Sequence, residues 1–136
     1  MDERAFKRPI SDLHLPPVKS LDFQMNIHAA VIIMQRENIG SVVITEKDRV
    51  VGILTERDIL KKVVGIIEDY KKALVTEIMT REPTCIRLSD EIGMALNLIE
   101  EGGFRHLPVL ADDGTPLSIV LIKDVLAYLA HREKSK

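Results

Sequence analysis

A threonine and an aspartate lie three residues apart where a short apolar run, Val50–Leu54, gives way to a helical pattern. Thr55 ends the expected strand, and Asp58 falls in the first turn of the expected helix. The N–H groups at a helix start are unpaired and carry partial positive charge, so an anionic group is favoured there. A carboxylate suits a pair of sugar hydroxyls better than a phosphate. Together the two side chains match the two ends of a ribose 5′-phosphate.

The same two residues also have a purely structural interpretation. A threonine followed three residues later by an acidic residue fits a capping box, in which Thr55 caps the helix and Asp58 reaches back to the backbone of Thr55. Short motifs of this kind also occur by chance, so the stretch alone leaves both interpretations open. Its recurrence in the second half of the chain favours a functional role.

The second half of the chain repeats the first with an offset of about 65 residues. Ile27 and Ala30 fall on Ile92 and Ala95, on the apolar face of an expected helix in each half. Beyond a turn that is one residue longer in the second copy, Asp58 falls on Asp124. An insertion confined to a turn is what a duplication tolerates. The chain is therefore interpreted as one unit present twice.

Each copy predicts the same order of elements: an extended segment, an amphipathic helix of roughly 13 residues, two strands joined by a polar turn, and a closing helix. Asp22 in the first copy, and Ser89 and Asp90 in the second, are expected to cap the amphipathic helices. The extended segments and strands are expected at 18–21, 40–45 and 49–54, and again at 84–88, 106–110 and 117–121, with closing helices beginning near Glu56 and Lys123.

The two copies are expected to span 10–66 and 75–131, with a polar, partly helical connector at 67–74. A unit of this size is marginal alone, so stacking the two sheets would bury one continuous core. The apolar residues at 119–126 either fill that core or form a further interface, and both interpretations stay open.

The composition excludes several classes of function. Apolar residues make up 46% of the chain and charged residues 29%, as in soluble globular proteins. A formal charge of -2 gives no electrostatic case for binding nucleic acid or an anionic membrane. The single Cys85 cannot form an internal disulfide, which suits a reducing compartment. With no apolar run of membrane-spanning length, the sequence predicts a cytoplasmic location.

Three motifs give the chain a resemblance to a known family. They are Gly52–Ile59 (GILTERDI), Glu77–Thr80 (EIMT) and Phe104–Val109 (FRHLPV). At this spacing in a duplicated chain they resemble the CBS domain pair, also called a Bateman module. The resemblance implies an α/β (α+β) fold of tandem β-α-β-β-α repeats with pseudo-twofold symmetry. It also implies a homodimer that binds an adenosine-containing nucleotide (AMP, ADP or ATP) between the repeats as a regulatory ligand, without catalysis.

The resemblance also assigns roles to individual residues. Thr55 is similar to the family's phosphate-side hydroxyl and Asp58 to its ribose ligand, with Asp124 in the equivalent ribose position. Arg105 and His106 would approach the phosphates, as an arginine fork suits phosphate oxygens. Arg57 either contacts phosphate or covers the helix surface, and Leu107 lies beside the basic pair. The residues expected on the adenine side are Lys19, Ser20, Thr84, Cys85, Ile53 and Val120.

The second copy departs from the family pattern at two positions. Leu121 stands where the first copy has Thr55, and Ser118 stands where it has Gly52. A leucine donates no hydrogen bond, and losing one polar contact to a charged group costs about 1.5–3 kcal/mol. The Asp58 site is therefore expected to bind nucleotide more tightly than the Asp124 site.

Two other classes of function are weighed against nucleotide sensing. One is a structural scaffold for homodimerisation or protein interaction, in which Thr55 and Asp58 only cap a helix. The other is an enzyme, which is disfavoured because the sequence has no phosphate-binding G-x-x-x-x-G-K-[ST] loop, no nucleophile elbow and no metal-ligand spacing among His14, His28, His131 and Cys85. The effector protein that a sensor would regulate is not specified by this sequence.

Overall fold

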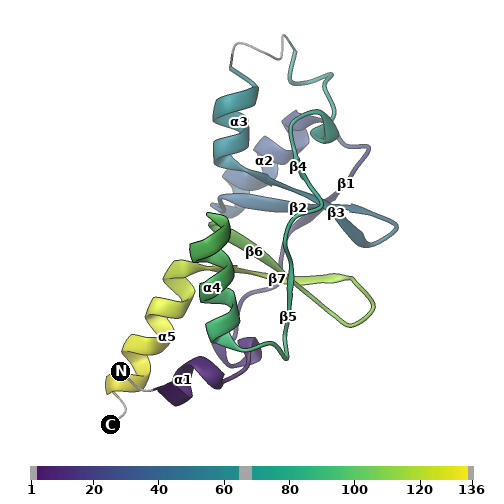
Figure 1. The fold of residues 1–136 in the computed structure, drawn as a ribbon. Coiled ribbons are helices and arrows are strands. Elements are labelled where there is room, and N and C mark those ends of the chain that lie inside the picture. Colours follow the sequence, from purple (N-terminus) through teal and green to yellow (C-terminus); the bar gives the residue numbers. More distant parts are fainter. Residues whose placement is uncertain (1–2, 65–68, 135–136) are drawn as a thin grey trace. The chain divides into compact units, whose positions relative to one another are not determined.

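Two small sheets with helices against them form the fold (Figure 1). The computed structural model describes residues 3–64 and 69–134. Residues 65–68, which include the end of the predicted first copy and the start of the predicted connector, lie outside the described residues. The first sheet has the strand order β1-β2-β3-β4 and the second the order β5-β6-β7. This mixed α/β architecture confirms the predicted fold class.

The chain divides into two packing units. The Asp58 unit comprises Val18–Pro83 and Gly114–Pro116, and the Asp124 unit comprises the described residues of Met1–Pro17, Thr84–Asp113 and Leu117–Lys136. The predicted sequence repeats at 10–66 and 75–131 divide the chain differently, and those boundaries stay a prediction.

The Asp58 unit contains a four-stranded sheet. β1 and β2 run parallel with a helix between them, and β2 pairs with β3 and β3 with β4 in antiparallel fashion. A two-residue turn joins β2 to β3, and both of its residues, Lys47 and Asp48, have positive φ, as a tight hairpin requires. The elements are β1 (Ser20–Asp22), α2 (Ile27–Glu37), β2 (Ser41–Glu46), β3 (Arg49–Thr55), α3 (Glu56–Lys62), the 3-10 turn η2 (Val75–Glu77) and β4 (Thr80–Arg81).

The Asp124 unit shares the order strand, helix, strand, strand, helix with the Asp58 unit, around a three-stranded sheet. β5 and β6 run parallel with a helix between them, and β7 lies next to β6. The elements are α1 (Glu3–Lys7), the 3-10 turn η1 (Ile10–Leu13), β5 (Ile86–Arg87), α4 (Ile92–Gly102), β6 (His106–Leu110), β7 (Pro116–Leu121) and α5 (Ile122–Lys134). The sequence interpretation did not include α1 or the strand β4.

Each unit has its own apolar core under the helix that connects its parallel strands. On α2 the buried residues Ile27, Ala30 and Met34 share one face, as the helical period requires. On α4 the fully buried pair is Ile92 and Ala95, which confirms the predicted faces. Both helices span 11 residues rather than about 13.

The predicted helix caps were wrong. Asn26, not Asp22, caps α2 by accepting a hydrogen bond from the N–H of Ala29 at 2.9 Å. Asp22 instead accepts from the N–H of Gln24 two residues on, and Asp90 accepts from the N–H of Arg87. Both aspartates stabilise the turn before the helix, because short polar side chains compete equally well for local N–H groups in turns.

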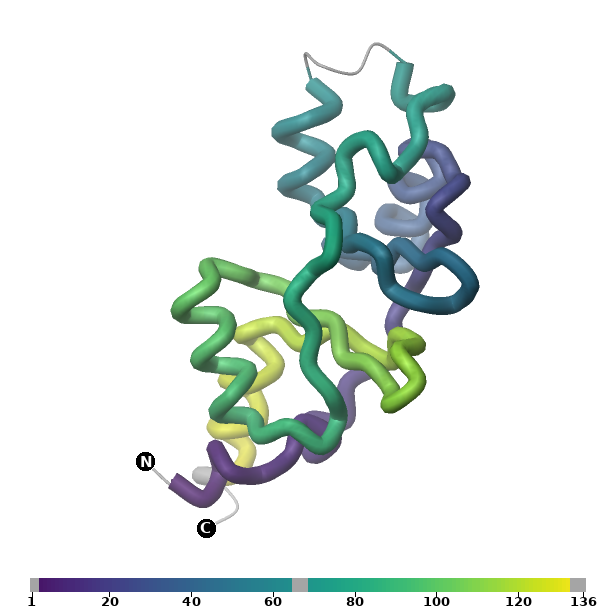
Figure 2. The backbone as a smooth tube through the Cα atoms, turned by 45° about the vertical axis from the view of Figure 1, so that its right-hand side comes forward, coloured from purple at the N-terminus to yellow at the C-terminus, as the bar shows by residue number. Residues whose placement is uncertain are grey.

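The segment that leads into each sequence repeat packs with the helix of the other repeat. Ile10 donates its N–H to the carbonyl of Asp90 at 2.8 Å, and Val75 donates to Met25 at 2.9 Å. Ile10 belongs to the core of the Asp124 unit and Val75 to that of the Asp58 unit. Figure 2 shows the purple start of the chain beside the green α4 and the yellow α5. The two repeats therefore exchange their leading segments.

Candidate functional site

The junction between β3 and α3 is closed by a reciprocal set of hydrogen bonds. The N–H and the hydroxyl of Thr55 both donate to Asp58 Oδ2, at 3.0 and 3.1 Å. In return the N–H of Asp58 donates to Thr55 Oγ1 at 3.2 Å. Thr55 is thus the helix cap and Asp58 completes a capping box. The predicted capping box is therefore confirmed.

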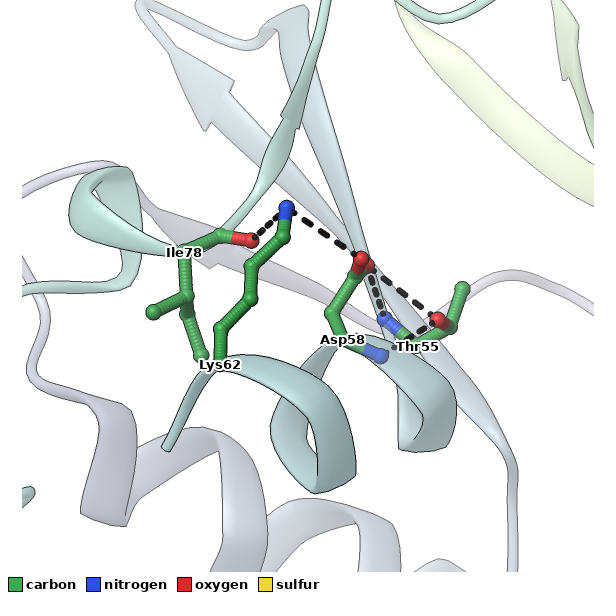
Figure 3. A network of polar contacts seen from close by, with 4 residues as sticks. All are labelled: Thr55, Asp58, Lys62 and Ile78. Carbon is green, nitrogen blue, oxygen red and sulfur yellow. Dashed lines mark hydrogen bonds and ion pairs between the residues drawn. The ribbon is translucent and has the colours of Figure 1, made fainter. Parts of the chain in front are cut away.

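The other carboxylate oxygen of Asp58 faces a lysine one turn further along α3 (Figure 3). Lys62 Nζ lies 3.5 Å from Asp58 Oδ1 and donates to the carbonyl oxygen of Ile78 at 3.0 Å. The Asp58 side chain is 13% exposed and the Lys62 side chain 41%. The network therefore holds the carboxylate in one orientation at the surface of the junction.

The hydrogen-bonding capacity of this network decides what it can bind. A carboxylate has about four lone-pair sites, and two are used on Oδ2 by Thr55. Oδ1 keeps the capacity to accept from ligand hydroxyls, because its ion pair with Lys62 is long. The Thr55 hydroxyl has a single proton, which it gives to Asp58. A phosphate contact by Thr55 would therefore require that bond to be released.

The equivalent junction in the Asp124 unit keeps only half of this arrangement. The N–H of Leu121 donates to Asp124 Oδ2 at 2.9 Å. Leu121 has no hydroxyl to complete the box, and Tyr128 occupies the place one turn on that Lys62 has in α3. Tyr128 instead accepts a hydrogen bond at its hydroxyl from Arg132 at 3.2 Å. The two junctions share the carboxylate and differ in its surroundings.

Four of the predicted site residues join Thr55 and Asp58 in the Asp58 unit. Ile53, on β3, is 5% exposed and pairs with Val43. Lys19 and Ser20, at the start of β1, are exposed, and Lys19 lies 3.8 Å from Glu37 in a surface ion pair. Arg57 is exposed on α3. Their contacts with a ligand remain predictions.

The other predicted site residues belong to the Asp124 unit. Leu107 and Val120 are fully buried in its core, so they support the strands rather than offer polar groups. Arg105 is exposed just before β6, and His106 is half-buried at its start. Thr84 and Cys85 precede β5 and are also half-buried. Burial raises the pKa of the Cys85 thiol above its ordinary value, which lowers its thiolate fraction.

Sequence reasoning missed Lys62 and the carbonyl of Ile78 as parts of the site. A signal was available, because a lysine four residues after an aspartate on a helix commonly forms an ion pair with it. The contact with Ile78 has no such signal, since it joins residues 16 positions apart through the fold.

Across 3–64 and 69–134, no helix is long and apolar enough to cross a membrane. Within the same ranges no three histidine, cysteine, aspartate or glutamate residues are grouped to hold a metal ion.

Comparison with known proteins places this architecture and its repeated junction in one family. The CBS domain profile matches the chain twice, at residues 10–65 and 75–131. These two matches cover most of the sequence, and the chain belongs to the CBS domain family, as a pair of CBS domains.

Two curated relatives illustrate how far the likeness extends. The mitochondrial CBS domain-containing protein CBSX3 of Arabidopsis thaliana is 30% identical over an alignment that covers 100% of this chain and 72% of the relative. An uncharacterised protein of Methanopyrus kandleri is 36% identical over 68% of this chain. The match spans 48% of that relative, so about half of its length has no counterpart here.

Solved structures show the same fold. One CBS domain crystal structure superimposes with a TM-score of 0.83 at 29% identity, covering 90% of this chain and 98% of the other. A CBS domain protein of Pyrobaculum aerophilum, solved in complex with AMP, gives a TM-score of 0.78 at 23% identity, covering 90% of this chain and 98% of the other.

Proposed function

We propose that this CBS domain pair is a regulatory module that senses an adenosine-containing nucleotide of the AMP, ADP or ATP class. The observation that carries the proposal is the oriented carboxylate of Asp58, with one oxygen anchored by Thr55 and the other 3.5 Å from Lys62 Nζ. The AMP complex of the Pyrobaculum aerophilum relative, which has the same fold, supports this class of ligand.

In this proposal the ribose hydroxyls donate to Asp58 Oδ1, the oxygen that Thr55 leaves available. A charge-assisted hydrogen bond of this kind is stronger than one between neutral groups. Within the described residues Lys62 has one hydrogen bond, to the carbonyl oxygen of Ile78, and one long ion pair with Asp58, so in this proposal its ammonium turns from Oδ1 toward the phosphate. Thr55 acts as a positioning residue that fixes the carboxylate.

The module acts by population shift rather than by catalysis. A nucleotide that binds one conformation better than another stabilises that conformation, which an effector protein then recognises. The size of the response is limited by the difference in affinity between the two conformations.

Exposed apolar side chains on the closing helices support a homodimer. In the Asp58 unit Leu60 is 70% exposed on α3, and in the Asp124 unit Leu126 is 59% exposed on α5. Of the apolar residues at 119–126, Val120 and Val125 fill the core, whereas Ile122 and Leu126 remain exposed. A second copy of the chain would bury such side chains, as homodimer interfaces are rich in apolar residues.

The test is a thermal-shift series with AMP, ADP, ATP and, as a control for the base, GMP. Ligand at 100 times its dissociation constant adds about 2.7 kcal/mol to the free energy of unfolding, so a bound adenosine nucleotide raises the Tm clearly. We expect at least one adenosine nucleotide to raise the Tm and GMP to have a smaller effect. A flat response to all four would contradict the proposal and favour the alternative, a dimerisation scaffold in which the capping box is purely structural.

A further inference from the structure

A pocket lies in the Asp58 unit, and none of the residues that line it belongs to the Thr55–Asp58 junction. Its volume is about 560 Å³, which is in the range of small-molecule sites. Phe23, Val51 and Met79 supply an apolar floor, and Glu46, Arg81 and Glu82 supply charges at the rim. We call it the Glu46–Arg81–Glu82 pocket. The lining residues include Val51 of β3 and Arg81 of β4. These two strands pair at one edge of the four-stranded sheet (Figure 1).

The charged groups of this pocket do not neutralise one another. Arg81 Nη2 donates to the carbonyl oxygen of Thr76 at 3.1 Å, which fixes one side of the guanidinium and leaves its other N–H groups free to donate. Within the described part of the chain, neither Glu46 nor Glu82 has a side-chain hydrogen bond or ion pair. The pocket therefore presents two carboxylates and one guanidinium over an apolar surface.

The backbone at Glu82 gives independent support for a role in binding. Glu82 has a φ of 44°, in the left-handed region that favours glycine, and it precedes Pro83. The other non-glycine residues with positive φ have evident local causes. His14 and Asn38 end helices, and Lys47 and Asp48 form the hairpin turn. Strained backbone positions of this kind cluster at binding sites, and this one lies at the pocket.

We propose that the Glu46–Arg81–Glu82 pocket binds a cationic α-amino acid, arginine or lysine. The ligand's α-carboxylate pairs with the guanidinium of Arg81, in the two-pronged geometry that arginine favours. Its α-ammonium and its side-chain cation pair with Glu46 and Glu82, and its methylene groups cover the apolar floor. The ligand's net positive charge balances the net negative charge of the rim.

The test measures binding of two probes by calorimetry. L-arginine carries the carboxylate that Arg81 would bind, and agmatine is the same molecule without it. We expect wild-type protein to bind L-arginine about tenfold or more tightly than agmatine, the loss that follows from one charge-assisted contact. Arg81→Gln should weaken the binding of L-arginine by a similar factor and leave the binding of agmatine unchanged. Glu82→Gln should weaken both probes, whereas Glu100→Gln, an exposed glutamate in the Asp124 unit, should change neither.

Two further variants separate this site from the nucleotide site and from a structural role. Asp58→Asn should leave L-arginine binding unchanged, so that failure of nucleotide binding does not affect this result. Glu82→Gly should raise the Tm of the ligand-free protein, because glycine adopts the positive φ without strain, and should weaken L-arginine as Glu82→Gln does. No binding of L-arginine or L-lysine, equal binding of L-arginine and agmatine, or displacement of L-arginine by AMP would overturn the proposal.

Discussion

The two strand-to-helix junctions of this protein begin from equivalent sequence positions and arrive at different chemistry. At Thr55 and Asp58 the capping box is complete: two hydrogen bonds from Thr55 hold the carboxylate, the N–H of Asp58 donates back to Thr55, and Lys62 faces the other carboxylate oxygen. At Leu121 and Asp124 one N–H donates to the carboxylate, and the residue one turn on is a tyrosine. The comparison teaches that two carboxylates at equivalent positions are oriented differently by the residues around them.

The two sheets differ in a related way. Gly52 on β3 pairs with Arg81, and a side chain at this position would contact Met79 and come within 3.1 Å of the carbonyl oxygen of Thr80. The equivalent Ser118 is buried on β7, which lies at the edge of the three-stranded sheet. The glycine therefore allows the fourth strand, β4, to approach.

The largest stability effect is expected from exchanging these two residues. Gly52→Ser places a side chain against Met79 and the Thr80 backbone, and we expect it to lower the free energy of unfolding by about 1–3 kcal/mol, as overpacking does. Ser118→Gly removes a small buried side chain and should cost about 0.5–1 kcal/mol, the usual loss for glycine inside a strand. Urea unfolding of both variants measures the two losses. Equal losses would show that the space for β4 is not what distinguishes the two positions.

A smaller effect is expected from exchanging the capping residues. Thr55→Ala removes the hydroxyl that accepts from the Asp58 N–H, and should cost about 1 kcal/mol. Leu121→Thr supplies the hydroxyl that the Leu121–Asp124 junction lacks. It should raise the free energy of unfolding by up to about 1 kcal/mol, and the lost burial of the leucine side chain reduces that gain. The same unfolding measurements apply. A stabilised Thr55→Ala variant would contradict the capping geometry.

The smallest effect concerns the start of the Asp124 unit. Arg8 Nε lies 2.6 Å from Asp12 Oδ2, and this hydrogen bond holds the pKa of the Asp12 carboxyl below its ordinary value. A lowered pKa in the folded state adds stability that is present above the ordinary pKa of aspartate, near 4, and is lost as the pH falls through the folded value.

We therefore expect Asp12→Asn to destabilise the protein slightly at neutral pH and to match the wild type in acid. Unfolding curves of the two proteins from pH 6 to pH 3 should converge. Curves that diverge toward low pH would show that the Arg8–Asp12 pair adds more stability in acid than at neutral pH, the opposite of what a lowered Asp12 pKa predicts.

The sequence predicted every strand except β4, and the core faces of the helices, because hydrophobic periodicity is local. The residues Ile27, Ala30, Ile92 and Ala95 were identified as core by spacing alone, and all four are fully buried. The exchange of leading segments, in which Ile10 packs beside Ile92, could not be predicted in this way, since periodicity identifies a buried face and not its partner.

At the candidate site the sequence identified the Thr55–Asp58 pair and left its two interpretations open. The structure shows that the capping box is present and that it engages Oδ2 of Asp58 and not Oδ1. The two roles are compatible because a carboxylate has enough lone pairs for both. The cap at Asn26 was missed because several residues near a helix start can accept the same N–H, and the backbone path selects among them.

The central claim is that the Asp58 junction, and not the Asp124 junction, provides the stronger ribose site. Calorimetric titration of AMP into wild type, Asp58→Asn and Asp124→Asn tests it most directly, because asparagine keeps one oxygen to accept the local N–H and removes the charge. We predict that Asp58→Asn weakens AMP binding at least about tenfold, as loss of a charged hydrogen-bond partner does, while Asp124→Asn changes it much less. Equal losses in both variants, or AMP binding unchanged by Asp58→Asn, would contradict the account.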